Sequence, residues 1–236
     1  MKAFLLAAGK GSRISKSIPP IPKSTLEVGG VPLIIRTIDM LRNHNIDVTV
    51  IVGYKHDYIE KVIGDKATIV YNPFYDVTNS IGSLYLAKDY IQEEDIIIAN
   101  ADVFWSEELL NLVLNAKEDV VMLSDKLRAD DGDYFFGTEN GLIKRYGKEL
   151  TRDNRDCEYV GIAGLKTSFV PTFKSRLIEM VSKQMHNVWW ENVLYSMIEE
   201  RDIYALDVNG LFWGEVDFIE DYQRILNYVE KNEKGV

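Results

Sequence analysis

Residues 2–13 of the chain read KAFLLAAGKGSR, and this stretch decides the fold. Lys2 to Ala7 is a short apolar run ended by glycine, which is typical of a buried strand in a parallel sheet. A long polar loop follows, from Ala8 to about Thr25. Because ligands of open α/β sheets bind at the carboxyl ends of the strands, this loop is the first candidate for a binding site.

Strands and helices alternate through the rest of the first half. Apolar runs predict strands at 48–52, 67–71 and 95–99, and helical spacing predicts helices at about 32–41, 54–63 and 79–90. Pro32 stands where the first of these helices would start. Strands separated by helices predict right-handed βαβ crossovers, and therefore an α/β fold with a mainly parallel sheet.

The second half is less regular. We expect strands at 120–123, 159–165, 203–207 and 211–214, helices at about 168–182, 189–201 and 217–230, and a hairpin over 134–146 that turns at Glu139-Asn140-Gly141. The sequence has no internal repeat and no linker rich in proline, glycine or serine. We therefore predict a single domain, 1–236, with halves of about 1–124 and 125–236.

Composition and charge narrow the class of protein. Of 236 residues, 46% are hydrophobic and 27% charged, which fits a folded globular protein. The net charge of −10 argues against nucleic-acid binding, which needs a basic face. The single cysteine, Cys157, excludes a disulfide framework, and no apolar run is long enough to cross a bilayer. We expect a cytoplasmic protein without membrane insertion.

The loop after the first strand suits phosphate groups. Gly9 and Gly11 allow the backbone to approach a phosphate chain with its N–H groups. Arg13 offers a forked donor for phosphate oxygens, and Lys23, after Pro22, offers a compact charge. The stretch is not a P-loop, because it lacks Gly-Lys-Ser/Thr at the required spacing, and it lacks the third glycine of a dinucleotide-binding fingerprint.

Taken with Pro22-Lys23, the string at 5–13 resembles the signature of nucleotidyltransferases that activate sugar phosphates and similar phosphomonoesters. Residues 79–88, NSIGSLYLAK, and 213–217, WGEVD, are similar to segments of the bacterial CTP:phosphocholine cytidylyltransferases of the LicC type. The resemblance spans nearly the whole chain in order. It implies a three-layer αβα Rossmann-like nucleotidyltransferase fold with a mixed, mainly parallel central sheet. The first half would bind nucleotide and the second half the acceptor.

The resemblance also implies an activity and the residues that carry it. The enzyme would transfer CMP from CTP to phosphocholine or a similar small zwitterionic phosphate or phosphonate, with Mg²⁺ as cofactor and pyrophosphate as the leaving group. Lys23, Arg13 and Asp102 would be catalytic, and Asp102 with Asp217 would bind the metal. Taken alone, Asp102 would be a loop-capping carboxylate and Asp217 the N-cap of the last helix.

The same resemblance assigns a set of nucleotide-binding residues. They are Leu6, Ala7, Ala8, Gly9, Lys10, Gly11, Ser12, Arg13, Asn79, Ser80 and Gly82. Asn79 and Ser80 stand at the start of a helix, where capping is an equally good explanation of these residue types. The preference for CTP over UTP rests on the resemblance alone.

Aromatic and acidic side chains alternate at two places in the second half. Trp189, Trp190 and Glu191 form one group, and Trp213 and Glu215 form the other. A quaternary ammonium favours aromatic faces beside a negative charge, so we expect these five residues at the acceptor. Each tryptophan alone is more typical of a packed core, as are Tyr134 and Tyr159. Asn100 replaces an acid that several relatives carry, which weakens the case for a second metal ion.

Two rival functions remain open from the sequence. One is the same chemistry with UTP or dTTP and a sugar 1-phosphate. The other is a catalytically silent nucleotide-binding module that regulates a partner, which the presence of Lys23 and Asp102 disfavours. Under the leading hypothesis the partners are CTP and a small phosphorylated acceptor.

Overall fold

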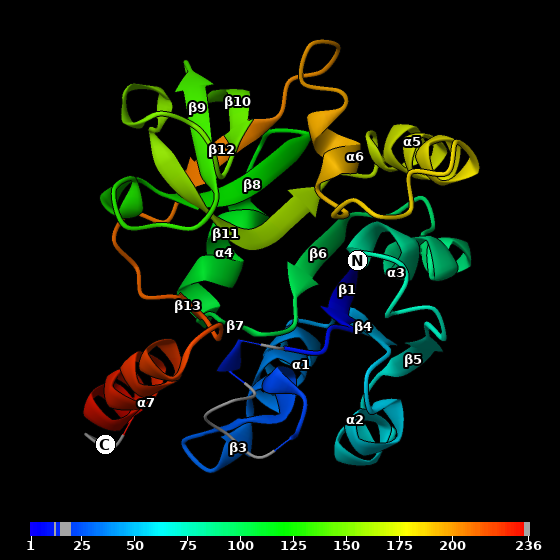
Figure 1. The fold of residues 1–236 in the computed structure, drawn as a ribbon, viewed down its shortest axis with the longest axis vertical. Coiled ribbons are helices and arrows are strands. Elements are labelled where there is room, and N and C mark those ends of the chain that lie inside the picture. The colour runs from blue at the N-terminus through cyan, green and yellow to red at the C-terminus, as the bar shows by residue number, and fades with distance from the viewer. Residues whose placement is uncertain (12, 15–19, 234–236) are drawn as a thin grey trace.

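The computed structural model describes residues 1–11, 13–14 and 20–233. Among these, nine strands form one sheet (Figure 1). From edge to edge they are β5 (Thr68–Tyr71), β4 (Asp47–Val52), β1 (Lys2–Ala7), β6 (Ile96–Asn100), β11 (Cys157–Leu165), β8 (Val120–Asp125), β12 (Tyr204–Asp207), β10 (Leu142–Gly147) and β9 (Phe135–Glu139).

The sheet is mixed, as predicted, and its two halves differ. The pairs β5–β4, β4–β1 and β1–β6 are parallel, and β12 is parallel to β8. The remaining pairs are antiparallel. Because β9 pairs with both β10 and β11, the pairings from β11 through β8, β12, β10 and β9 return to β11. Parallel pairing therefore dominates only the first four strands, and β11, β8, β12, β10 and β9 form a closed ring.

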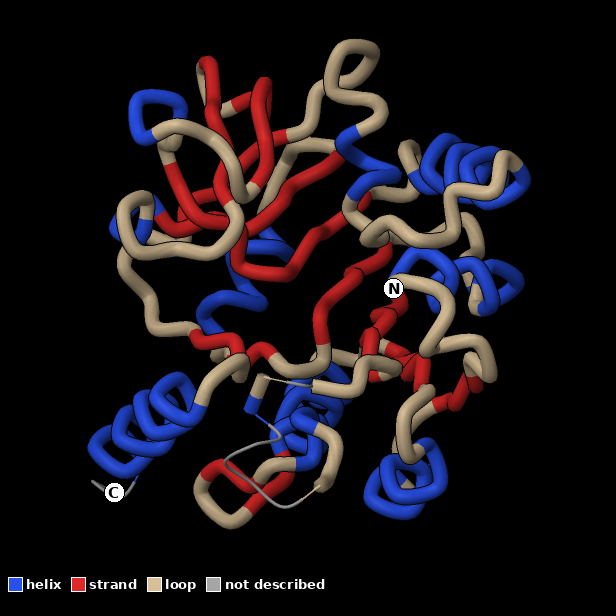
Figure 2. Tube along the Cα trace, viewed as in Figure 1, coloured by secondary structure: helices blue, strands red, loops and turns tan. Residues whose placement is uncertain are grey.

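Helices cover both faces of the sheet, so the predicted three layers are confirmed (Figure 2). One face packs against α3 (Ser80–Leu86), α5 (Val170–Ser182) and α6 (Asn192–Tyr195). The other face packs against α1 (Leu33–Asn43), α2 (His56–Ile63) and α4 (Glu107–Asn115). In β1, Phe4 joins the first core, while Ala3 and Leu5 join the second. This alternation is that of a strand buried on both sides.

A smaller cluster ties the end of the chain to its beginning. The last helix, α7 (Ile219–Glu233), packs Ile225 and Val229 against Val28 and Leu33, beside the short strands β2 (Glu27–Val28) and β3 (Val31–Pro32). Ahead of α7, β13 (Gly214–Glu215) pairs with β7 (Val103–Phe104), the strand that follows β6. This short antiparallel pair joins the end of the sheet's fourth strand to a segment more than a hundred residues later.

The structure differs from the expected elements in several places. Helix α4 was not predicted, although Ser106 precedes it and Glu107 and Glu108 lie in its first turn. The expected helix at 189–201 is only α6, and of the expected strand at 211–214 only Gly214 belongs to β13. The described residues also include the 3₁₀ helices η2 (Lys23–Thr25), η3 (Lys88–Tyr90), η4 (Lys126–Arg128) and η5 (Arg152–Asn154).

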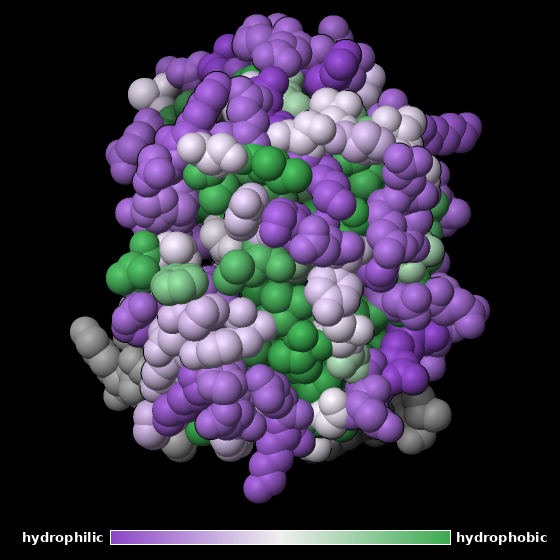
Figure 3. Space-filling view, turned by 90° about the vertical axis from the view of Figure 1, so that its right-hand side faces the viewer, coloured by the Kyte–Doolittle hydropathy of each residue, from purple (hydrophilic) through white to green (hydrophobic). Residues whose placement is uncertain are grey.

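The surface is mainly polar. On the side that carries α2, α3 and α5, hydrophilic side chains surround separate apolar patches (Figure 3). In the described part of the chain, the search for a helix with the length and hydropathy of a membrane span found none.

Candidate active site

A cavity of about 450 Å³ opens at the carboxyl ends of β1 and β6. Ala7 and Ala8 line it from the first strand and its loop, and Asn100 and Asp102 line it from the end of the fourth. Residues from the second half of the chain, among them Tyr159 of β11, also line the cavity. The sequence therefore locates the cavity correctly at the edge where the glycine loop begins.

Backbone pairing brings three carboxylates together at this edge. Asp102 follows β6, and Glu215 lies in β13 opposite Val103 of β7. The backbone N–H of Val216 donates to the carbonyl oxygen of Asp102 at 2.9 Å. As a result, one carboxylate oxygen from each of Asp102, Glu215 and Asp217 lies within 4.8 Å of the other two. Such a group of hard oxygen donors fits a divalent cation such as Mg²⁺.

Lys23 lies against the same carboxylates. Its Nζ donates to Asp102 Oδ2 at 3.0 Å and also to Asp217 Oδ1. Burial opposes the charge of this side chain, but Asp102 and Asp217 outweigh it, so the pKa of the Lys23 ammonium is raised. Lys23 is therefore a fixed cation here and not a proton acceptor.

Gly11 makes room for Lys23. Its φ is +60°, and a Cβ at this position would lie 2.5 Å from Cγ of Lys23. Only glycine fits both the conformation and the space. The two glycines of the loop thus have different surroundings, because no atom lies within 4 Å of a Cβ placed on Gly9.

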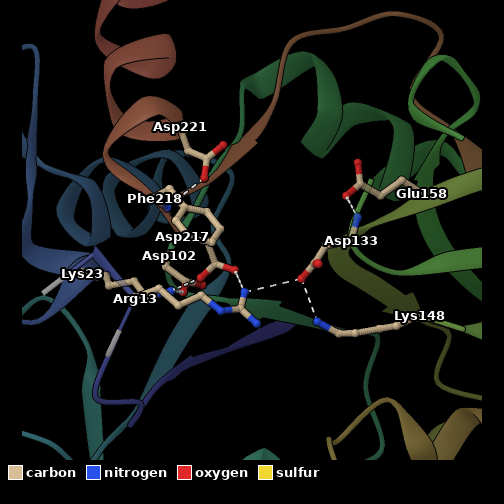
Figure 4. A network of polar contacts seen from close by, with 9 residues as sticks. All are labelled: Arg13, Lys23, Asp102, Asp133, Lys148, Glu158, Asp217, Phe218 and Asp221. Atoms are coloured by element: carbon tan, nitrogen blue, oxygen red, sulfur yellow. Dashed lines mark hydrogen bonds and ion pairs between the residues drawn. The ribbon is translucent and has the colours of Figure 1, made fainter. Parts of the chain in front are cut away.

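Arg13 continues the chain of ion pairs. Its Nη1 lies 2.5 Å from Asp217 Oδ2 and 3.5 Å from Asp133 Oδ2, and Lys148 Nζ lies 2.7 Å from the same Asp133 oxygen (Figure 4). Asp217, aided by Asp133, raises the pKa of the Arg13 guanidinium. Three cations and three carboxylates thus alternate along one wall of the cavity, from Lys23 and Asp102 to Lys148.

Most of the predicted nucleotide residues line the cavity. They are Leu6, Ala7, Ala8, Gly9, Gly11, Arg13, Asn79 and Ser80. Ser12 lies outside the described residues. Lys10 does not line the cavity, and its Nζ lies 5.6 Å from the centre of the Tyr75 ring. Gly82 does not line the cavity either, and a Cβ placed on it would lie 2.8 Å from Cβ of Thr78, which precedes α3.

Asn79 and Ser80 combine capping with exposure to the cavity. Asn79 Oδ1 accepts from the backbone N–H of Ser80 at 2.7 Å, which caps α3. Ser80 Oγ accepts from the backbone N–H of Trp190 at 2.9 Å. Both readings that the sequence left open for these residues are therefore compatible with their positions.

The predicted acceptor residues divide into two groups. Trp189, Glu191 and Glu215 line the cavity, but Trp190 and Trp213 do not. Trp190 is fully buried in the core. Trp213 is buried as well, and its indole N–H donates to Asp125 Oδ2 at 2.9 Å. The expectation that these two tryptophans contact an acceptor is corrected, because packing and a buried hydrogen bond account for both.

The sequence analysis did not predict part of the cavity lining. Tyr159 lies in the core and Tyr134 packs against it, as expected, but both also line the cavity together with Tyr195, Asp133 and Lys148. Tyr134 immediately precedes β9 and Lys148 immediately follows β10, so the two ends of the predicted hairpin meet at the cavity. The hairpin itself was the available signal, since strands that pair from a tight turn bring residues beyond their ends together.

The cavity is also lined by buried acidic side chains. Burial, with Asp102 as a further contributor, raises the pKa of Glu191 to about 7. Burial together with Asp102 and Asp217 raises the pKa of Glu215 well above its usual range. Among the described residues the hydroxyl of Tyr159 has no hydrogen-bond partner. Buried carboxyl and hydroxyl groups of this kind favour a cationic or hydrogen-bonding ligand.

These features define a nucleotidyltransferase site, and the sequence comparison agrees. Residues 3–201 match the model of the MobA-like NTP transferase domain. The chain belongs to this family, and it is an enzyme of the nucleotidyltransferase class. The resemblance to nucleotidyltransferases and their fold, expected from the sequence, are both confirmed.

Particular relatives narrow the comparison. The chain is 26% identical to a CTP:phosphoglutamine cytidylyltransferase of Campylobacter jejuni, with 94% of this chain and 98% of the relative covered. It is also 26% identical to a choline-phosphate cytidylyltransferase of Haemophilus influenzae, with 99% and 100% covered.

Solved structures share the fold. The inositol-1-phosphate CTP transferase from T. maritima matches with a TM-score of 0.77 at 18% identity, covering 98% of this chain and 96% of that one. The CTP:phosphocholine cytidylyltransferase from Streptococcus pneumoniae (LicC) matches with a TM-score of 0.74 at 21% identity, covering 97% and 98%.

Proposed function

We propose that the chain transfers CMP from CTP to phosphocholine or a similar small zwitterionic phosphate or phosphonate, with Mg²⁺ as cofactor. The observation that carries the proposal is the meeting of Lys23 and Arg13 with Asp102, Glu215 and Asp217 in one cavity below the glycine loop. Cytidylyltransferases among the relatives that cover nearly the whole chain support the choice of nucleotide.

The reaction forms one bond and breaks one. A phosphate oxygen of the acceptor attacks the α-phosphorus of CTP, and the bond from that phosphorus to the oxygen bridging to the β-phosphate breaks, which releases pyrophosphate. A phosphomonoester is largely dianionic at neutral pH, so no strong base is needed. The difficulty is the approach of two anions, which positioned cations relieve.

Lys23 and Arg13 divide this task. Lys23, partly buried beside Asp102, is suited to the α-phosphate and the incoming acceptor phosphate. Arg13 lies further along the wall and is more exposed, so it suits the β- and γ-phosphates that leave. Both cations now pair with carboxylates, and substrate phosphates would compete for the same donors.

The divalent cation would be held by Asp102 and Asp217, with Glu215 as a third oxygen donor. When bound there, Mg²⁺ neutralises charge on the triphosphate. Asn100, which lines the cavity two residues before Asp102, accepts from the indole N–H of Trp190 at 3.4 Å. The Asn100 side chain is a neutral amide that already accepts a hydrogen bond, and it stands where a second metal ion would need an acid. The site therefore suits one metal ion better than two.

The nucleotide and the acceptor would share the cavity. Leu6 to Gly9, with Asn79 and Ser80, are suited to the base and ribose. Trp189 and Glu191 line the same cavity, next to the backbone N–H that bonds to Ser80 Oγ, and the buried acid suits the amine of the acceptor. In this proposal 1–124 and 125–236 are two halves of a single domain, joined by one sheet.

A panel of substrates tests the proposal. CTP, UTP and dTTP would each be combined with phosphocholine, phosphoethanolamine, 2-aminoethylphosphonate and glucose 1-phosphate, with Mg²⁺ or with EDTA, and pyrophosphate release measured. We expect turnover with CTP and an amine-bearing acceptor, and none with EDTA. Product from UTP or dTTP and the sugar phosphate alone would favour the rival activity. Nucleotide binding without any product would favour the regulatory module.

A further inference from the structure

Lys148 places a cation in the cavity beside Trp189. It follows β10, and its Nζ lies 2.7 Å from Asp133 Oδ2 and 5.5 Å from the centre of the Trp189 ring. The side chain lines the cavity and is 34% exposed, so it is reachable from solvent and from a ligand.

The aromatic groups around Lys148 form one assembly. Tyr134 meets Trp189 edge to face at 5.5 Å, and Tyr195 stacks between Tyr134 at 5.8 Å and Tyr146 at 4.2 Å. Within this assembly the face of Trp189 already carries the ammonium of Lys148. A trimethylammonium placed on the same ring would meet a like charge, which opposes its binding.

The position of Lys148 relative to the reaction site also matters. Lys23 and Lys148 lie at opposite ends of the row of ion pairs that runs through Asp217, Arg13 and Asp133 (Figure 4). Arg13, between them, is assigned to the departing phosphates, so an acceptor whose phosphate reaches Lys23 would extend its other end across the cavity, beside this row, towards Lys148. Lys148 would then meet the part of the acceptor that differs from one phosphomonoester to another.

The charges at that end specify a kind of headgroup. Lys148 and Asp133 present one positive and one negative charge side by side, and Arg13, the other cation near Asp133, is the one assigned to the phosphates of CTP. The complementary ligand carries a carboxylate for Lys148 and an ammonium for Asp133. A dianionic second phosphate fits less well, because Asp133 and the nearby Glu158, whose carboxylate accepts from the backbone N–H of Asp133 at 2.8 Å, would repel it.

We propose that Lys148 determines acceptor specificity by binding a carboxylate, so that the enzyme favours a phosphorylated amino-acid-type acceptor over one that carries only an amine. The inference rests on the proposed cytidylyl transfer and names the substrate class within it. Lys148 binds the remote end of the acceptor and touches none of the reacting atoms.

The proposal is tested with pairs of acceptors that differ only in the carboxylate. O-phosphoserine and phosphoethanolamine differ only by that group, as do O-phosphohomoserine and 3-aminopropyl phosphate. With CTP and Mg²⁺, we expect the wild-type enzyme to use at least one carboxylated member with a higher kcat/KM than its partner. Lys148→Ala should lower kcat/KM for that acceptor about tenfold to a hundredfold, as for loss of one charge-assisted hydrogen bond, mainly through KM.

Control variants and contrary results complete the test. Lys148→Ala should leave kcat/KM for the decarboxylated acceptors within about twofold of the wild type, and Lys148→Arg should retain the preference. Lys183→Ala, which removes an exposed lysine paired with Glu179 on α5, should change nothing.

Equal use of both members of each pair, or a preference that survives Lys148→Ala, overturns the inference while cytidylyl transfer stands. Absence of product with CTP and every amine-bearing acceptor overturns the proposed function, and the inference with it.

Discussion

Lys23 shares its carboxylates with the candidate metal site. Its ammonium bonds to Asp102 and Asp217, two of the three acids whose oxygens lie within 4.8 Å of one another. Because its pKa is raised, Lys23 stays protonated through the physiological range and can act on the reaction only as a positive charge. Its contribution should therefore be to the transition state, where negative charge concentrates at the α-phosphorus.

Replacement of Lys23 tests this role. We expect Lys23→Ala to lower kcat by about 10²–10³-fold, the usual effect of losing one positioned donor to a developing charge. Steady-state pyrophosphate release measures the effect, and circular dichroism checks the fold. The control is Lys10→Ala, which removes a lysine from the same loop that lies outside the cavity. Full activity of Lys23→Ala would refute the assigned role.

Asp217 offers a second test at single-residue scale. Asp217→Asn keeps the shape but removes one of the three carboxylates, so we expect half-maximal activity to need about tenfold or more Mg²⁺. The measurement is activity against Mg²⁺ concentration. Asp221→Asn is the matched control, because Asp221 lies four residues further on and accepts from the backbone N–H of Phe218, outside the acidic group. An unchanged Mg²⁺ requirement in Asp217→Asn would remove Asp217 from the metal site.

At the scale of elements, the glycine loop controls where Lys23 lies. Gly11→Ala would force an alanine into a φ of +60° and bring its Cβ within 2.5 Å of the Lys23 side chain. Gly64 has the same φ of +60° at the end of α2, but a Cβ there meets no atom within 4 Å. The pair separates backbone strain from displacement of Lys23.

We therefore expect different outcomes from the two alanine variants. Each should lose about 1–3 kcal/mol of unfolding free energy, because alanine disfavours a positive φ. Only Gly11→Ala should also lose activity, by about tenfold or more, because Lys23 must move. Denaturant unfolding and pyrophosphate release measure the two effects. Equal activity losses in both variants would mean that the space beside Gly11 has no special importance.

Local signals predicted most elements, and long-range pairings account for what was missed. The strand from Lys2 to Ala7 has the predicted bounds, and Asn140 and Gly141 have the positive φ values of 54° and 82° that a tight hairpin turn requires. In contrast, no local pattern marks β7 and β13, which are two residues each. Their pairing is what brings Glu215 to Asp102, so the third acid of the site could not be assigned to the metal from the sequence.

The candidate site shows the same division. Arg13, Lys23, Asp102 and Asp217 could be selected because a family resemblance marks them, and the structure brings them together. Residue type alone could not separate Trp189, which lines the cavity, from Trp190, its buried neighbour. Successive residues leave the backbone in different directions, and which one meets the cavity depends on how the segment before α6 packs against Ser80.

At the scale of the whole molecule, buried acids make the site a source of instability. The chain has a net charge of −10, and its cavity adds Glu191 and Glu158, the pKa of each raised to about 7 by burial. A group whose pKa is higher in the folded state holds its proton when the unfolded chain has already released it. The folded state therefore loses stability as pH rises from the ordinary value of 4.5 towards 7, and the loss is complete above that.

Glu191→Gln should remove its share of this dependence. A shift from 4.5 to about 7 corresponds to about 3 kcal/mol, none of it felt below pH 4.5 and all of it above pH 7. We expect the variant to gain in melting temperature over the wild type as pH rises through this window, by about 2–4 °C per kcal/mol for a chain of this size. Glu93→Gln, on the exposed surface, is the charge-matched control and should follow the wild type. Glu191→Gln should also bind an amine-bearing acceptor less well, since the Glu191 carboxylate that destabilises the empty cavity is the one proposed to receive the cation. If the difference in melting temperature between Glu191→Gln and the wild type stays constant from pH 4.5 to 7, Glu191 is ionised throughout this range. Its carboxyl group is then not desolvated as its burial implies.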